Sequence, residues 1–156
     1  MAGLYSAAKA LRHAELLQES MESTFDILEQ LGEELPRESG DDQLNIDMQL
    51  MNDILQKTPD DLILIMEATK KKKIVTLMKL YANLSDVLHF TKPSLISSVS
   101  LRMVDLTMKT GLNSISPLAF AYYGEILTSI GNLTEGCRLG TCWISMHGNL
   151  CFQLCN

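Results

Sequence analysis

Apolar residues recur about once per helical turn along most of this 156-residue chain. That spacing is typical of helices with one buried face, whereas a half-buried strand alternates apolar and polar residues with a period of two. No sustained alternation of that kind, bounded by hairpin turns, occurs in the sequence. The pattern therefore predicts an all-α protein, and its clearest stripe consists of Ile74, Leu77, Met78, Tyr81, Leu84 and Leu88.

A glycine and a proline mark the end of the first helical segment. An N-terminal stripe covers residues 4–31, and we expect a break in its helix near Ser20. Gly32 is a suitable helix C-cap, and Pro36 prevents the helix from resuming. Residues 33–42 are strongly polar. They are interpreted as a connection.

A second helix is expected at residues 44–55, with Leu44, Met48, Met51 and Leu55 on its buried face. Thr58 then offers an acceptor for the free amides of a new helix, and Pro59 suits its first position. The acidic pair at residues 60–61 complements the positive end of a helix. These signals predict a short helix over residues 62–66.

The second half of the chain predicts paired helices. One is expected at residues 93–110, closed by Gly111. Another is expected at residues 117–131, where Ser116 and Pro117 repeat the signal of a capping residue followed by proline. Short connections favour antiparallel neighbours, and such pairs bury both faces only when they stack. The expected fold is therefore about seven to eight helices in stacked antiparallel hairpins, as in an α-solenoid.

The charge of the chain bears on its partners. Its net charge of −6 opposes non-specific binding to nucleic acids. The only basic run, Lys70 to Lys73, is short and begins an amphipathic helix, so we interpret it as a solvated face. We therefore expect the partners to be proteins or neighbouring domains, and no nucleic acid.

Targeting signals are missing from the sequence. The N-terminus lacks the apolar core of a signal peptide, and no run of 18 or more apolar residues predicts a transmembrane helix. These features predict a cytoplasmic protein without a membrane span. Asn83 and Asn132 fit the glycosylation acceptor pattern, and without a secretory signal we interpret both as chance matches.

The stretch at residues 93–140 is more specific than a generic helical pattern. It contains Leu101-Arg102-Met103-Val104-Asp105-Leu106-Thr107, then Ser116-Pro117-Leu118-Ala119-Phe120-Ala121-Tyr122-Tyr123-Gly124, then Gly131-Asn132-Leu133-Thr134-Glu135-Gly136-Cys137-Arg138-Leu139-Gly140. Over residues 21–140 the chain resembles the tetratricopeptide-like (TPR-like) helical region of large multidomain signalling ATPases, which combine kinase-like, predicted AAA ATPase and sensor histidine kinase domains. The resemblance implies a TPR-like helical-repeat region at residues 1–140, cut from a larger protein.

Within that stretch we expect a helix-packing motif formed by Tyr122, Tyr123, Gly124, Gly131, Gly136 and Gly140. A glycine inside a helix is less favourable than alanine by roughly 1 kcal/mol, so an internal glycine needs a compensating role. Gly124, Gly136 and Gly140 fall inside expected helices, and we expect them to let two helix backbones approach closely. The two tyrosines would pack between layers, and Gly131 lies in the expected turn.

Residues 141–156 depart from this pattern, because they contain the only tryptophan and three of the four cysteines. We interpret them as an atypical Cys-rich tail. The spacing of Cys137, Cys142, His147, Cys151 and Cys155 would allow zinc ligation on a helix. However, no Cys-x2-Cys pair is present, so reduced cytosolic thiols are the favoured interpretation. No metal and no cofactor are expected.

The sequence carries no recognisable catalytic motif. Gly131 and Gly136 have the spacing that begins a P-loop, but Cys137 and Arg138 replace its Lys-Ser/Thr. The three histidines, His13, His89 and His147, have no companion residues at a fixed spacing. We therefore expect no catalytic residue.

Two main hypotheses of function remain, beside the weaker one of a stand-alone metal sensor built on the C-terminal thiols. One is a non-catalytic scaffold or protein-interaction segment in signal transduction. The other is a fragment of a signal-transducing ATPase or protein kinase whose catalytic domains lie outside this chain. A truncated solenoid also leaves an apolar repeat end uncovered, which predicts self-association through that end.

Overall fold

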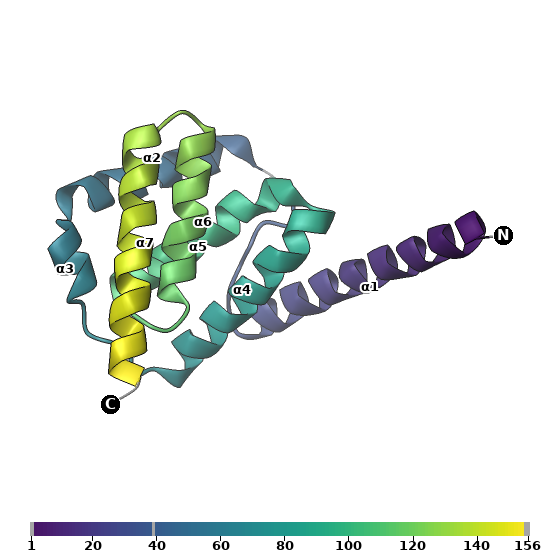
Figure 1. Cartoon of the computed structure of the whole chain (residues 1–156), viewed down its shortest axis with the longest axis horizontal. Helices are drawn as coiled ribbons and strands as arrows, with labels where there is room; N and C mark the ends of the chain where they lie inside the picture. Colours follow the sequence, from purple (N-terminus) through teal and green to yellow (C-terminus); the bar gives the residue numbers. More distant parts are fainter. Residues whose placement is uncertain (1, 39, 155–156) are drawn as a thin grey trace.

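A computed structural model describes the backbone of residues 2–38 and 40–154, and the side chains of residues 12–38, 40, 42–142 and 144–145. The described residues form seven α-helices, a short 3-10 helix and no strand, which confirms the all-α prediction (Figure 1). The α-helices are α1 (Ala2–Gln30), α2 (Asp41–Lys57), α3 (Asp60–Leu64), α4 (Lys72–Thr91), α5 (Ile96–Thr110), α6 (Ser116–Ser129) and α7 (Leu133–Leu154). None of them is long and apolar enough to cross a bilayer, within the part of the chain that is described.

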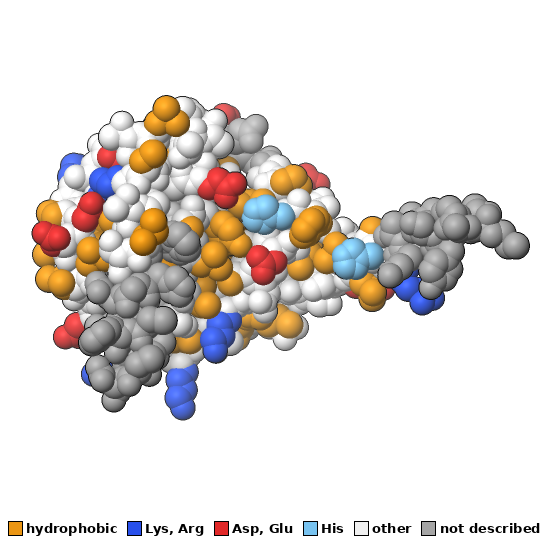
Figure 2. Space-filling model, viewed as in Figure 1, with side chains coloured by type: hydrophobic (Ala, Val, Ile, Leu, Met, Phe, Trp, Pro, Cys, Tyr) orange, Lys and Arg blue, Asp and Glu red, His pale blue; other side chains and the backbone are white. Residues whose placement is uncertain are grey.

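Helix α4 lies at the centre of the fold, packed against both α1 and α5. The apolar stripe expected on it is confirmed, because Leu77, Met78, Tyr81, Leu84 and Leu88 are all buried. The lysines at residues 70–73 are exposed at its start, as a solvated face requires. In Figure 2 basic side chains lie at the lower edge of the molecule, where Figure 1 shows the beginning of α4.

Helix α1 is a single helix of 29 residues. The break expected near Ser20 is therefore wrong, because no glycine or proline interrupts residues 4–30 and the Ser20 carbonyl simply accepts the Thr24 hydroxyl at 2.8 Å. The helix ends at Gly32, as predicted. There the Glu33 amide donates to the Leu28 carbonyl at 3.0 Å, which satisfies a free carbonyl of the last turn. The polar connection that follows leads to α2.

The expected capping by Thr58 and Pro59 is wrong. Thr58 Oγ1 donates to the Ile54 carbonyl at 2.7 Å, so this residue closes α2 instead of opening α3. Pro59 precedes the first turn of α3, which spans residues 60–64 and not the expected 62–66. Only two residues separate the helices, so a residue that ends one cannot also begin the other.

Ser116 likewise does not cap α6, because Ile115 takes the capping position. The Ser116 side chain instead accepts the Asn113 amide at 3.0 Å and lies 3.1 Å from Thr107 Oγ1 of α5. All three of these polar groups are in a buried setting, where a hydroxyl needs a partner. The serine therefore fastens the turn to α5.

Gly111 ends α5, as predicted, with a φ of +100° that favours glycine. A side chain would also not fit, because a Cβ at this position would come within 2.3 Å of the Glu67 carbonyl oxygen. The Leu112 amide donates to that oxygen at 3.0 Å, and the Thr69 amide donates to Leu112 at 2.8 Å. This contact ties the segment before α4 to the turn before α6.

Helices α6 and α7 form an antiparallel hairpin (Figure 1). Its turn lies at Gly131, which has a φ of +91°. The Asn132 amide donates to the Leu127 carbonyl at 2.8 Å, and the Asn132 side chain accepts the Glu135 amide at 3.4 Å. Helix α7 continues through Gly140, so the change in composition at residue 141 lies inside one helix.

Candidate functional site

Helix α2 has a second apolar face besides the one that it buries. Its buried face contains Met48, Met51 and Leu55. Ile46, Leu50 and Ile54 follow one another at intervals of four residues, and 52%, 57% and 47% of their surface is exposed. A surface helix usually keeps polar residues on its outer side, so this stripe marks a contact surface.

Leu50 and Ile54 border a groove of about 660 Å³ between α2, α5 and residues 34–36. Its apolar lining also includes Leu35, Leu44, Met51 and Leu101. The volume lies within the usual range of ligand sites, about 300–1,000 Å³. This groove is the candidate functional site.

The unpaired charges of the groove are negative. Asp105 accepts Arg102 Nη1 at 2.8 Å and Lys109 Nζ at 2.9 Å, so both cations in the lining are already engaged. Glu34 and Asp47 also line the groove, and neither forms an ion pair with any residue that the structure describes. The groove therefore favours a ligand with basic groups beside its apolar surface.

Glu33 joins three helices next to the groove. It lies three residues after the end of α1, and it accepts the Tyr81 hydroxyl of α4 at 2.6 Å and Arg102 Nε of α5 at 2.8 Å. Burial raises the pKa of Glu33, but hydrogen bonds from Arg102 and Tyr81 outweigh that effect, and the pKa lies below its usual value. Burial and the nearby carboxylate raise the pKa of Tyr81, which keeps this hydroxyl protonated as a donor. The network fixes Arg102 as part of the groove wall.

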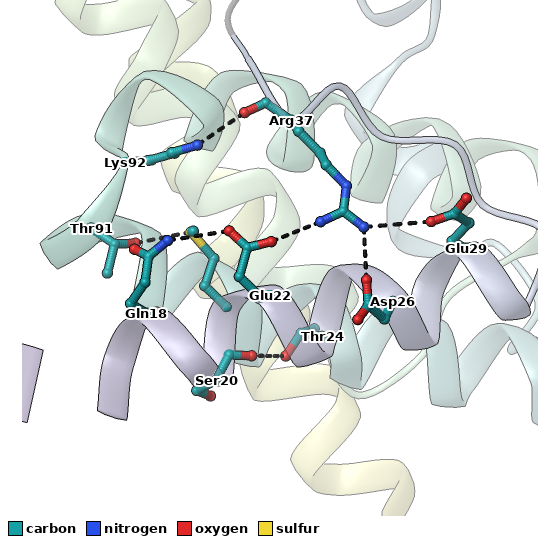
Figure 3. A network of polar contacts seen from close by, with 10 residues as sticks. Gln18, Ser20, Glu22, Thr24, Asp26, Glu29, Arg37, Thr91 and Lys92 are labelled. Atoms are coloured by element: carbon teal, nitrogen blue, oxygen red, sulfur yellow. Dashed lines mark hydrogen bonds and ion pairs between the residues drawn. The ribbon is translucent and has the colours of Figure 1, made fainter. Parts of the chain in front are cut away.

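Arg37 holds the segment that leads from α1 towards the groove. Its guanidinium donates to Glu22 at 2.7 Å and to Asp26 at 2.8 Å, and it lies 5.3 Å from the Phe25 ring centroid. Figure 3 shows Arg37 above the acidic side of α1, with Lys92 donating to its carbonyl. Exposed pairs of this kind each stabilise a fold little, but together they define the path of the segment.

A second polar joint attaches α7 to α2 and α3. Arg138 donates to the Asp60 carboxylate, to Glu135 at 2.9 Å and to the Leu55 carbonyl at 2.9 Å. Leu55 lies in the last turn of α2, and its carbonyl also accepts the Thr58 amide at 3.1 Å. A cation is favourable at this negative end of the helix. Sequence analysis mentioned Arg138 in the family-like stretch and in the rejected comparison with a P-loop. No local pattern indicated that Arg138 would attach α7 to α2 and α3.

The cysteines described by the structure do not form a metal site. Cys137 is exposed, whereas Cys142 is 3% exposed and lies near Asp60. Burial and Asp60 raise the pKa of the Cys142 thiol to about 11, so it stays protonated at neutral pH. Among the described residues, no three metal-binding side chains come together. The side chains of His147, Cys151 and Cys155 lie outside the described residues.

Gly124 of α6 and Gly136 of α7 face each other across the hairpin. A Cβ on Gly136 would lie 2.2 Å from Thr128 Oγ1 and 2.7 Å from the Gly124 carbonyl oxygen, so the backbones approach too closely for a side chain. Gly140, expected to have the same role, does not have it. A Cβ there would meet nothing within 4 Å, so no neighbouring atom excludes a side chain at this position.

The two tyrosines of the expected motif have different settings. Tyr123 is fully buried, and its hydroxyl lies 3.2 Å from the Met48 carbonyl and 3.1 Å from Asn52 Oδ1 of α2. Tyr122 is half-buried, and its hydroxyl donates to Asp86 of α4 at 3.0 Å. Tyr123 therefore joins α6 to α2, and Tyr122 joins α6 to α4.

Reasoning from the sequence did not single out the groove. The repeated spacing of Ile46, Leu50 and Ile54 would have indicated a second apolar face on α2. Glu34 and Asp47 give no such signal, because isolated acidic residues are common on surfaces. Comparison of the chain with protein-family models, curated proteins and solved structures finds no match.

Proposed function

We infer that this chain is a non-catalytic interaction module whose α2–α5 groove binds a basic amphipathic helix of another protein or of a neighbouring domain. The observation that carries this proposal is the exposed apolar stripe of α2 beside a groove whose Glu34 and Asp47 carboxylates form no ion pair with a described residue, although Gln43 donates to Asp47 at 2.8 Å. The succession of α5, α6 and α7, each packed on the next, supports the TPR-like stacking and scaffold role that the resemblance implies.

The dimensions of the groove suit a short helix. Residues 43–54 of α2 line it, and 11 steps of 1.5 Å give a length of about 16 Å, or three turns. An occupying helix would place apolar residues at intervals of three or four against Leu50 and Ile54. Basic residues on its flanks would lie near Glu34 and Asp47. On the α5 side of the groove, Asp105 pairs with Arg102 and Lys109, and these ion pairs suit a rigid groove wall.

The test uses two synthetic peptides with the same apolar helical face, one flanked by lysines and one by glutamates. Fluorescence anisotropy of the labelled peptides is followed as the full chain is added. We expect saturable 1:1 binding of the basic peptide, at least tenfold tighter than that of the acidic one. This preference should decrease with added salt, because the carboxylates that cause it are screened.

Substitutions then locate the binding surface. Leu50→Glu should weaken binding of the basic peptide at least tenfold by placing a charge on the apolar stripe. Ile65→Glu is the matched control, because Ile65 is 73% exposed and does not line the groove. Equal weakening by both substitutions, or equal affinity for the two peptides, would refute the proposal.

A further inference from the structure

Residues 2–20 of α1, here called the arm, extend away from the rest of the molecule (Figure 1). Among the described side chains of α1, full burial begins at Met21 and continues at Phe25 and Leu28. Within residues 12–20 every side chain is exposed except that of Leu17, which is half-buried. At 1.5 Å per residue the arm is about 28 Å long.

A helical extension of this kind gains little stability from the rest of the chain. Most helical stability in proteins comes from packing of an apolar face. The chain itself supplies no packing partner to residues 12–16 and 18–20, whose side chains are exposed. The arm is therefore suited to packing against a second molecule.

The arm continues the apolar register of the buried part of α1. Leu4, Ala7, Leu11 and Ala14 occupy the same two positions of a seven-residue repeat as Met21, Phe25 and Leu28. A seven-residue repeat is the pattern of helices that pack side by side. Gln18 is the single polar residue at these positions. The apolar register that α4 covers on α1 thus continues through the sequence of the arm.

Helix α4 stops where the arm begins. It runs antiparallel to α1, since Tyr81 reaches Glu33 while Thr91 Oγ1 lies 3.3 Å from Met21 Sδ, and it ends at Thr91. Beyond Thr91, a second helix could take the place of α4, run antiparallel to α1 and cover the same apolar register. Its positive N-terminus would then meet the negative C-terminus of α4, and Phe90, which is 80% exposed, lies at that junction.

Charge indicates what this second helix is. Residues 2–10 contain Lys9 as their only charged side chain and sum to +1, while residues 12–20 contain Arg12, Glu15 and Glu19 and sum to −1. Two arms packed antiparallel bring the positive half of each arm beside the negative half of the other, whereas a parallel pair brings halves of the same charge together. We propose that two copies of this chain associate by packing their arms antiparallel, each arm continuing the line of the other copy's α4.

The first test is the mass of the full chain by light scattering over a range of concentrations. We expect a reversible dimer, with twice the 17.4 kDa of one chain. Leu11→Glu should weaken the dimer at least tenfold, because Leu11 lies in the apolar register near the middle of the arm. Leu16→Glu is the matched control, because Leu16 is 58% exposed and falls outside that register. Circular dichroism verifies that both variants keep the folded body.

The second test reports the direction of packing. Chains with Ala7→Cys are mixed with chains with Ala14→Cys, oxidised and analysed by peptide mapping, with the unsubstituted chain as background. Antiparallel arms should form the mixed 7–14 disulfide, and a preference for 7–7 and 14–14 links would overturn the proposal. A monomer at every concentration would overturn it too, as would a monomer that binds phosphatidylserine vesicles through the arm.

Discussion

At the scale of single residues, Gly136 and Gly140 form a natural pair for comparison, because both lie inside α7 and only Gly136 lacks space for a Cβ. Gly136→Ala should destabilise the fold by about 1–3 kcal/mol, since its Cβ would press on the Gly124 carbonyl and on Thr128. Gly140→Ala should stabilise the fold by about 0.5–1 kcal/mol, since alanine favours the helix and has open space. Urea unfolding of both variants measures these changes. A Gly136→Ala variant as stable as the unsubstituted chain would contradict the close approach of α6 and α7.

The same glycines show what local sequence can and cannot predict about residues. An internal glycine indicates that something offsets its helical cost, and that reasoning located Gly124 and Gly136. It could not separate them from Gly140, because four residues along a helix rotate the Cα position by about 40°. Whether a side chain at the rotated position would contact the neighbouring helix depends on the angle at which the two helices cross. No single residue in the stretch determines that angle.

At the scale of helices, Arg138 links α7 to the end of α2 and the beginning of α3. Arg138→Gln should destabilise the fold by about 1–3 kcal/mol, because it removes the hydrogen bonds that the guanidinium donates to Asp60 and to the Leu55 carbonyl. The loss should be local, so amide hydrogen exchange of α3 and the last turn of α2 should accelerate most. Arg37→Gln, which removes an exposed cation, should change exchange in these helices far less. Unchanged exchange in α3 would show that the joint does not hold it.

Helix boundaries were predictable where glycine or proline stops a helix, as at Gly32 and Gly111. The assignment of caps was less successful at Thr58 and Ser116. A hydroxyl side chain can close the preceding helix, open the next or bond to a third element, and the choice depends on neighbours in space. Thr58 bonds back to Ile54, and Ser116 bonds to the Asn113 amide and lies beside Thr107.

At the scale of the whole molecule, Glu33 connects the end of α1 to α4 and α5, so its protonation should affect global stability. Its pKa is lower in the folded chain than the ordinary value of 4.5. The stability that it contributes is therefore present at neutral pH and is lost as the pH falls from about 4.5 through the lowered native pKa. Glu33→Gln should destabilise the chain by about 1–3 kcal/mol at pH 7, and this difference should shrink at acidic pH.

The matched control for this titration is Glu34→Gln, because Glu34 is exposed and has no ion-pair partner among the described residues. It should change the free energy of unfolding by less than about 0.5 kcal/mol at either pH. Urea unfolding at pH 7 and near pH 3 compares the three proteins. A Glu33→Gln effect of the same size at both pH values would show that the carboxylate charge is not what stabilises the joint.

The arrangement of helices as a whole was beyond prediction from periodicity. The apolar stripes indicated which face of α2 and α4 is buried, and those faces are buried in the structure. They could not indicate that α2 packs on α5, or that Tyr123 and Arg138 reach α2 from the other half of the chain. Such contacts depend on how the surfaces of two helices that are distant in sequence fit together. An apolar stripe describes the surface of only one helix.

The long reach of Tyr123 and Arg138 has a consequence for how the chain is made. Their contacts with α2 span 75 and 83 residues. At about 5–20 residues per second, a ribosome needs roughly 4–17 s to add that much chain. For that interval a nascent α2 lacks its contacts with α6 and α7, so early protection by a chaperone matters more for this helix than its small size suggests.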